Sequence, residues 1–542
     1  MKEKADGSGV DLLLIDTGDR IEGNGLYGGS NPVGEYTSEI FKQQEIDVIC
    51  SGNHELYKKS SADREYLTTV PNFKDSYLAS NLDYIDSSTG KTVPLAPRFR
   101  KFTTKNQGIR IVAFGFLFDF TGNYNNTIIQ EVEKTVTETW FQEAIRDKDV
   151  DLFLVIGHVP VRSEEYTTIH KAIRAVNWDT PIQFFGGHTH IRDYKIYDSK
   201  TVALEGGRFM ETIGFMSIEG LSTSKAPTKR TAGLKFDRMY IDNNLYSFHH
   251  HTNLNDSTFP TTHGRTVSEY ITHARKTLKL DSVHGCAPQD FWLSRARYGS
   301  RDSIYTWLQD SVLPEAVVSK ERKDKPRLII VNTGAIRYDI FKGPFTRDTT
   351  FIVSPFTNEF HYIRDVPYTV ANKVALLINN EGDILVDAEP TMQVSSLRPP
   401  EQTSITKAVT VEEMPLLDYD ERVHSDQVRF GQHHGQDGGE PGLTPGYTTT
   451  DDLGDDGDDT VHTVMSNYRV PNCMLANASF PHSGAPEQVD LVFMDFIEPY
   501  ILLALSFLGQ EYTSEDARNY MGDETLGTVI TQWVEQNWDH DC

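Results

Sequence analysis

The 542-residue sequence has few cysteines, a deficit of basic residues and no long apolar run. None of its four cysteines is in CxxC spacing, which argues against a structural zinc site. Asp and Glu number 78 against 52 Lys and Arg, so the net charge is −26. This net negative charge would repel the phosphates of a nucleic acid, and no cluster of basic residues offsets it, which argues against a nucleic-acid partner. Small anionic substrates remain compatible with the composition.

No apolar run approaches the roughly 18 to 20 residues that a membrane-spanning helix needs. The longest candidate, YILLALSFLG at residues 500–509, suits a buried helix, so we expect no transmembrane segment. The first nine residues, MKEKADGSG, are charged and polar and do not form a signal peptide. The sequence does not indicate an oligomeric state.

The length predicts two or three domains. Apolar strand-like runs alternate with amphipathic helical segments, which predicts an α/β domain over residues 1–248. The polar stretch 249–265 is interpreted as a linker, and residues 266–542 as a second domain. Within the second domain, the acidic, Gly-rich residues from about 418 to 460 predict a long surface insertion.

Polar side chains follow several of the predicted strands at the point where each strand ends. The run LLLIDTGD ends in Asp19, and DVICSGNHE ends in Asn53 and His54. Ligands of open α/β sheets bind beyond the carboxyl ends of the strands. We therefore expect these side chains to meet there, together with those that end two later strands, His158, His188 and His190.

Carboxylate, amide oxygen and imidazole suit divalent Zn, Mn or Fe. Two such ions, roughly 3.5–4 Å apart, would share one carboxylate, hold a phosphoryl group and lower the pKa of a bridging water. A histidine outside the metal site would then stabilise the phosphoryl charge or protonate the leaving group. The pattern therefore predicts a metal-assisted phosphoester hydrolase.

The motifs of the first half, in this order, resemble the signature of the calcineurin-like metallophosphoesterases: GDR (18–20), GNHE (52–55), GHVP (157–160) and GGHTH (186–190). NTGAIR (332–337) and SPFTNEF (354–360) resemble substrate-domain motifs of the 5'-nucleotidase family. The resemblance implies a four-layer α/β/β/α metallophosphoesterase domain followed by a smaller 5'-nucleotidase-type C-terminal α/β domain. The segments GDDGDDTVH and VDLVFMDFIEPY resemble a fungal, vacuolar branch.

Carried over residue by residue, the resemblance implies that Asp19 bridges two metal ions. Asn53, His158 and His188 would complete one metal site, His190 would belong to the other, and His54 would be the catalytic histidine. It also implies a group of substrate-binding residues, in which the aromatic ring faces a base: Asn332, Arg337, Phe356 and Asn358. Arg295 and Arg301 are looser anion-binding candidates, for which a solvated basic segment is the alternative.

Two features depart from the family pattern. No Asp-x-His motif precedes Asp19, so the second metal would keep only His190 and the shared carboxylate, and we expect this chain to hold only one ion well. The chain is therefore interpreted as truncated at its N-terminus. Where the family often has an Asp that orients the catalytic histidine, this chain has Tyr57.

The first hypothesis is water attack on the phosphate of a nucleoside monophosphate or related phosphoester. One alternative is a non-catalytic pseudoenzyme or binding protein on the same fold, because the Asp-x-His motif is missing. Another is a phosphodiesterase or sugar-nucleotide hydrolase. We expect a vacuolar or secreted protein if an upstream segment carries a signal peptide.

Overall fold

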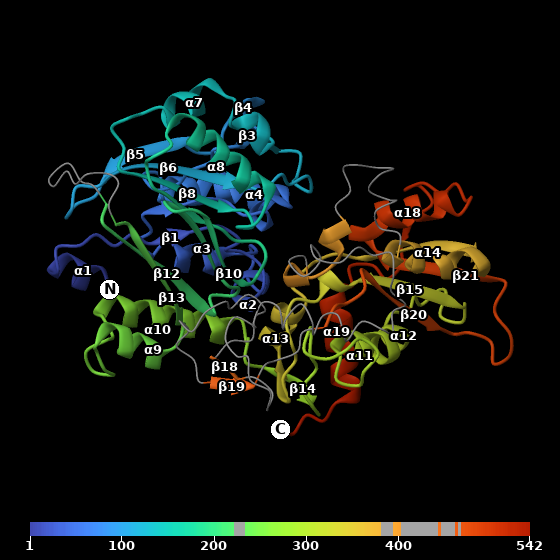
Figure 1. Ribbon diagram of the computed structural model, residues 1–542. Coiled ribbons are helices and arrows are strands. Elements are labelled where there is room, and N and C mark those ends of the chain that lie inside the picture. Colours follow the sequence, from blue (N-terminus) through green and yellow to red (C-terminus); the bar gives the residue numbers. More distant parts are fainter. Residues whose placement is uncertain (222–232, 381–393, 403–442, 446–460, 464–467) are drawn as a thin grey trace, which may run out of the picture. The chain divides into compact units, whose positions relative to one another are not determined.

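The computed structural model describes residues 1–221, 233–380, 394–402, 443–445, 461–463 and 468–542 (Figure 1). Its elements are mixed α/β, and they form two compact units. Among the described residues, the first unit contains 1–21, 37–221, 233–271, 443–445 and 461–463, and the second contains the others. Residues 22–36, which lie early in the sequence, thus belong to the second unit.

A six-stranded sheet is the centre of the first unit, with the order β10-β11-β9-β8-β6-β5. Its four inner strands are parallel and its two edge strands are antiparallel to their neighbours. All seven residues of β8 are buried, as expected for a parallel strand covered on both faces. The strands are β5 (Phe99–Thr103), β6 (Arg110–Leu117), β8 (Leu152–His158), β9 (Ile182–Phe185), β10 (Arg192–Asp198) and β11 (Thr201–Gly206).

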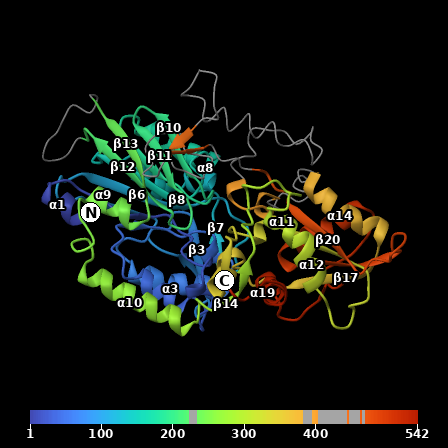
Figure 2. The same ribbon diagram turned by 90° about the horizontal axis from the view of Figure 1, so that it is seen from below.

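Both faces of this sheet are covered by apolar clusters. On one face, Phe114 and Phe184 pack with Phe141 of α7 (Thr139–Ile145) and Ile169 of α8 (Glu164–Val176). On the other face, Ile111 and Leu154 pack with Val48 of β2. The parallel pair on that side is β1 (Ile15–Asp16) with β2 (Val48–Ile49). Figure 2 shows α8 and the sheet strands β6, β8, β10 and β11 in a second view.

The remaining elements of the first unit include short helices and three small sheets. The helices are α1 (Lys2–Gly7), α3 (Glu35–Phe41), which continues from the second unit, η1 (His54–Leu56), α4 (Lys59–Arg64), η2 (Glu65–Thr69), α5 (Val70–Asn72) and α6 (Val132–Thr135). The strands are β3 (Leu82–Asp86), β4 (Lys91–Pro94), β7 (Thr127–Ile129), β12 (Thr212–Glu219) and β13 (Lys235–Asp242), with the antiparallel pair β18 (Leu443–Pro445) and β19 (Val461–Thr463).

Helices extend from both sides into residues 249–265, which the sequence suggested were a linker. α9 (Leu245–Thr252) begins at Asn244, whose side chain accepts a hydrogen bond from the Ser247 amide, and ends at Asn253 in the left-handed conformation. α10 (Thr262–Thr277) follows. Polar side chains here serve as helix caps as well as loop formers. The acidic stretch expected at about 418–460 lies outside the described residues apart from β18.

The second unit is built on a five-stranded mixed sheet with the order β20-β15-β21-β17-β22. The strands are β15 (Arg327–Asn332), β17 (Phe360–Pro367), β20 (Cys473–Ala478), β21 (Gln488–Met494) and β22 (Arg518–Asn519), with the separate pair β14 (Val283–Ala287) and β16 (Gly343–Thr346). The helices are α2 (Gly25–Gly28), α11 (Ile304–Trp307), η3 (Leu308–Val312), α12 (Leu313–Ala316), η4 (Thr333–Ala335), α13 (Arg347–Val353), α14 (Tyr368–Asn380), η5 (Val394–Leu397), η8 (Asp495–Ile497), α18 (Glu498–Phe507) and α19 (Leu526–Asn537).

Two contacts connect distant parts of the chain within the second unit. The Gly25 amide donates to the Asp348 carboxylate at 2.8 Å, and α2 packs on α13 so closely that a Cβ on Gly28 would lie 2.5 Å from the Phe351 ring. Cys286 forms a disulfide with Cys542, with their Cα atoms 5.6 Å apart. A disulfide that closes so long a loop stabilises a fold by about 2–4 kcal/mol.

The apolar stretch at residues 500–509 mostly lies within α18, whose Ile501 and Leu505 are fully buried in the core of the second unit. No helix in the described part of the chain combines the length and hydropathy that crossing a bilayer requires.

Candidate functional site

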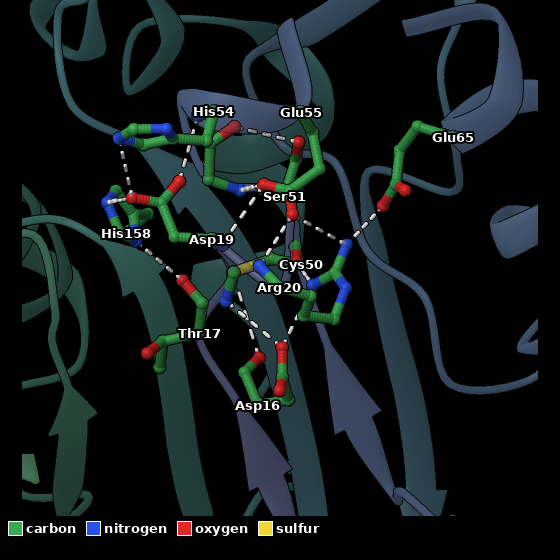
Figure 3. A network of polar contacts seen from close by, with 12 residues as sticks. Asp16, Thr17, Asp19, Arg20, Cys50, Ser51, His54, Glu55, Glu65 and His158 are labelled. Carbon is green, nitrogen blue, oxygen red and sulfur yellow. Dashed lines mark hydrogen bonds and ion pairs between the residues drawn. The ribbon is translucent and has the colours of Figure 1, made fainter. Parts of the chain in front are cut away.

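Three predicted ligands meet at the carboxyl ends of the strands in the first unit. Asp19 follows β1, His158 ends β8 and His188 follows β9, and one ligand atom from each lies within 4.8 Å of the others. The Nε2 atom of His158 is 3.0 Å from Oδ2 of Asp19. Figure 3 shows the Asp19 carboxylate between the rings of His54 and His158. Strand ends from two different sheets therefore bring together residues that are 169 positions apart in the sequence.

Two glycines let the loops after β1 and β2 approach each other. A Cβ on Gly18 would lie 2.2 Å from the Gly52 nitrogen, and one on Gly52 would lie 2.1 Å from the Asp19 carboxylate. Asp19 itself has a φ of 59° and His188 a φ of 82°, in the left-handed region that non-glycine residues rarely adopt. Such backbone conformations persist where surrounding contacts hold them, and they concentrate at functional sites.

The side chain of Asn53 is oriented for a ligand role. It is 2 % exposed, and its Nδ2 donates to the Tyr57 hydroxyl at 3.1 Å. Its Oδ1 is buried and accepts no hydrogen bond from any residue that the structure describes. An unsatisfied buried acceptor costs roughly 1–3 kcal/mol, and a cation would remove that cost. Asn53 thus fits a metal site together with the carboxylate and the two imidazoles.

His158 is held in one orientation by the chain next to Asp19. Its Nδ1 lies 3.0 Å from the carbonyl oxygen of Thr17, so Nδ1 carries the proton and donates it. Nε2 is then directed at Asp19. Metal-binding histidines usually have such a second partner for the other ring nitrogen. The His188 ring stacks on Phe118 with the centroids 4.2 Å apart.

The electrostatics of the cluster keep its carboxylate ionised. Burial works to raise the pKa of Asp19, but the facing His158 and His54 side chains outweigh burial and hold that pKa well below its ordinary value. A carboxylate that stays charged when buried is the form in which an oxygen binds a cation.

His54 lies beside this cluster. Its backbone N–H donates to Asp19 Oδ1 at 2.9 Å, and its Nε2 is 3.8 Å from Asp19 Oδ2. The Tyr57 ring packs edge-on against the imidazole, with centroids 5.2 Å apart. An aromatic ring therefore occupies the neighbourhood where the family pattern led us to look for an orienting carboxylate.

His190 is not a member of the three-residue cluster. It has a φ of 61°, and its ring contacts Phe209 with centroids 5.5 Å apart. Among the described residues, the structure thus gathers a carboxylate and two histidines for one cation and does not gather His190 with them.

The candidates in the second unit differ in their surroundings. The Arg337 guanidinium lies over the Phe356 ring at 4.9 Å, and its Nε and Nη1 are buried without a partner in the described part of the chain. Asn332 ends β15 and is buried. Asn358 donates to Asp495 at 2.6 Å and Arg295 lies over Trp292 at 4.7 Å, so both have protein partners. Arg301 is exposed.

Three residues that the sequence interpretation did not assign to the site contact it. Tyr57 contacts Asn53 and His54, while Arg20 and Glu55 link the loops beneath Asp19. Arg20 and Glu55 lie inside the quoted motifs GDR and GNHE. For these two, a charged residue directly next to a predicted site residue was the available signal, although the sequence does not show what it contacts.

Replacing Tyr57 with Phe is expected to weaken Mn²⁺ binding by about 10-fold, because Asn53 loses the partner that directs its Oδ1. Isothermal titration calorimetry on the purified protein measures this. The matched control is Tyr84→Phe, since the Tyr84 hydroxyl is also in a mostly buried residue but donates to Asp63, at 2.7 Å. Equal affinities of the two variants would contradict the role of Tyr57.

Comparisons with known proteins agree with this geometry. The family described as calcineurin-like phosphoesterase matches residues 1–192, and the family described as NAD nucleotidase, C-terminal domain, matches residues 290–502. The crystal structure of a 5'-nucleotidase from Candida albicans is 37% identical, covers 99% of this chain and 91% of that chain, and has a TM-score of 0.82.

Two curated relatives are similar over almost the whole chain. An uncharacterized protein of Schizosaccharomyces pombe is 37% identical over 570 residues, covering 100% of this chain and 86% of the relative. A protein of Arthroderma benhamiae named "Secreted protein" is 36% identical over 583 residues, covering 99% of this chain and 85% of the relative.

The fold and the site thus define a phosphoester hydrolase with a metallophosphoesterase domain and a C-terminal domain of the 5'-nucleotidase type. The chain belongs to the calcineurin-like metallophosphoesterases, within the 5'-nucleotidase family. The predicted α/β fold class and the predicted hydrolase class are confirmed.

Proposed function

We propose that the protein hydrolyses nucleoside monophosphates and depends on a divalent metal ion. The observation that carries the proposal is the cluster of Asp19, His158 and His188 beside the unsatisfied oxygen of Asn53. Zn, Mn and Fe suit this donor set. The 37% identity to a protein described as a 5'-nucleotidase supports the substrate class.

In this proposal Asp19, Asn53, His158 and His188 would hold a divalent cation, which would supply polarisation of the phosphoryl oxygen and a more nucleophilic water. His54, with its ring beside Asp19, stabilises the charge on the phosphoryl group or gives a proton to the leaving oxygen. No side chain forms a covalent intermediate, because water is the nucleophile.

Within the second unit, three of the residues expected to bind substrate offer groups that suit a nucleoside. Arg337 presents buried N–H groups without a described partner, which suits an anionic or carbonyl oxygen of the substrate. Phe356, next to it, offers an aromatic surface for a base, and stacking on such a surface is worth about 1–3 kcal/mol. Asn332 is the third member, whereas Asn358 and Arg295 already have protein partners.

We also propose that the protein works in an oxidising compartment, as a secreted or vacuolar protein. The disulfide between Cys286 and Cys542 supports this, because disulfides persist in such compartments and are rare in the cytosol. The Arthroderma benhamiae relative is named a secreted protein.

The metal requirement and the substrate class are tested together. Protein stripped with a chelator and dialysed is expected to release no phosphate from AMP, and stoichiometric Mn²⁺ or Zn²⁺ is expected to restore turnover. AMP is compared with an aryl phosphate, a bis-aryl phosphodiester and a sugar nucleotide. Faster hydrolysis of the diester or the sugar nucleotide than of AMP would replace the proposed substrate class with one of the two other hydrolase activities. Full turnover without metal would contradict metal dependence.

A further inference from the structure

A single buried carboxylate joins the two loops that carry Asp19, Asn53 and His54. Oε2 of Glu55 accepts hydrogen bonds from the Asp19 amide at 3.0 Å and the Gly52 amide at 2.9 Å. Its Oε1 accepts from the Arg20 amide at 2.7 Å. Glu55 is 1% exposed. Both oxygens therefore act as acceptors, and together they connect the loop after β1 to the loop after β2 (Figure 3).

The Arg20 side chain extends the same connection beneath the site. Its Nη1 donates to Asp16 Oδ1 at 2.9 Å and to the carbonyl oxygen of Cys50 at 2.7 Å. Its Nη2 contacts Glu65, whose carboxylate also accepts from the Tyr77 hydroxyl. Asp16 ends β1 and Cys50 follows β2, so one guanidinium links both strand ends to η2.

These charges are almost fully removed from water. The side chains of Arg20 and Glu65 are each 5 % exposed. Buried ion pairs add little stability compared with apolar residues of similar size, because desolvation offsets their attraction. The network instead orients its partners, because a planar guanidinium and a carboxylate fix the positions of several hydrogen-bonded groups at once.

The loop that they hold needs such support. Asp19 has a φ of 59°. Its carboxylate accepts a hydrogen bond from the His54 amide at 2.9 Å, and this bond joins the two loops. Immediately after Ile21 the chain passes into residues 22–36, which belong to the second unit. In its own unit, the segment after Arg20 therefore does not continue into a helix or strand that would fix the position of Asp19.

We propose that Glu55 and Arg20 are positioning residues that hold Asp19 and Asn53 at the spacing one divalent cation requires and keep His54 beside them. The proposal rests on the proposed metal dependence. Neither side chain binds the ion. Glu55 sets the distance between the loops through backbone amides, and Arg20 fixes the ends of the strands from which the loops start.

Glu55→Gln is the sharpest test, because it keeps size and shape. The glutamine has one acceptor oxygen, so its NH₂ group must face either the Arg20 amide or the pair of amides from Asp19 and Gly52. One side of the link is therefore lost. Calorimetric titration is expected to show Mn²⁺ affinity falling by about 10- to 100-fold, the range typical of residues that orient metal ligands. Phosphate release is expected to recover at saturating Mn²⁺.

Asp151→Asn is the matched control. Asp151 is also a buried carboxylate that accepts from a backbone amide, that of Arg110 at 2.9 Å, and from an arginine side chain at 2.8 Å. It precedes β8 and so lies at the end of that strand opposite His158. This variant is expected to lose thermal stability and to keep the wild-type Mn²⁺ affinity.

If Glu55→Gln does not fold, Arg20→Lys decides, because lysine keeps the charge but cannot reach Asp16, Cys50 and Glu65 together. It is expected to lower Mn²⁺ affinity by about 3- to 10-fold. A foldable variant that loses stability like Asp151→Asn and binds Mn²⁺ like wild type would overturn the positioning role and leave the proposed function standing. A wild-type protein that binds no divalent ion would instead contradict the proposed function, and the positioning role with it.

Discussion

Replacing His54 with alanine is expected to lower kcat for phosphate release from AMP by about 10²- to 10⁴-fold, the usual contribution of a general acid or base. The His54 ring lies 3.8 Å from the Asp19 carboxylate, yet the structure assigns its backbone N–H, rather than its ring, to the hydrogen bond that holds the loops together. The alanine variant keeps that N–H. Mn²⁺ affinity is therefore expected to stay within a few-fold of wild type, and steady-state kinetics with calorimetric titration separate the two effects.

His170→Ala is the control for His54→Ala. The His170 Nε2 is 2.8 Å from Asp198, which ends β10. Because β10 is antiparallel to its neighbour, Asp198 lies at the amino ends of the parallel strands, away from the site. This variant is expected to keep wild-type kcat. If His54→Ala lost its metal and its activity together, His54 would be a metal ligand or a structural residue, not a proton donor.

Much of the first-unit site follows from local sequence. An apolar run predicts each strand, and a polar residue directly after it must lie at the strand end. Parallel neighbours then bring His158 and the loop of His188 to the same edge. Asp19 joins them because Gly18 and Gly52 permit a close approach that any side chain would block. The strand ends depend on a few adjacent residues and are predicted from the sequence, whereas the approach of Gly18 to Gly52 is seen only in the structure.

Other features depend on partners that are distant in the sequence. The spacing of four cysteines does not indicate that Cys286 pairs with Cys542, 256 positions away. Composition likewise does not show that residues 22–36 belong to the second unit, where Asp348 accepts the Gly25 amide. The sequence also does not show that Asn244 caps α9, a helix that extends into residues 249–265. Tyr57 was noted only as a departure, and its bond to Asn53 is visible only in three dimensions.

Replacing Asp19 with asparagine is expected to weaken Mn²⁺ binding by at least about 100-fold, beyond the effect of changing a residue that only orients a ligand. Asparagine keeps the size of the side chain and an oxygen that can accept the His54 amide, so the loops stay connected. The substitution removes the negative charge. In the wild type the Asp19 carboxylate stays ionised, because the neighbouring histidines lower its pKa although burial acts to raise it.

The loss appears directly in the stability that metal adds. A ligand that binds only the folded state at 100 times its Kd contributes about 2.7 kcal/mol, and binding 100-fold weaker reduces this to about 0.4 kcal/mol. Thermal unfolding with and without Mn²⁺ is therefore expected to show a clear rise in Tm for wild type and almost none for Asp19→Asn.

Asp198→Asn shows whether the loss is specific to the cluster. Burial works to raise the Asp198 pKa, yet Arg174 and His170 hold it below its ordinary value. Such a carboxylate stabilises the fold above the pH at which it titrates when unfolded, near 4, and loses that contribution as the pH falls further. Asp198→Asn is therefore expected to lower Tm at pH 7 in metal-free protein and to keep the full rise with Mn²⁺. An equal rise in Asp19→Asn would mean that the cation binds without this carboxylate, and the proposed centre would lose the ligand on which its geometry depends.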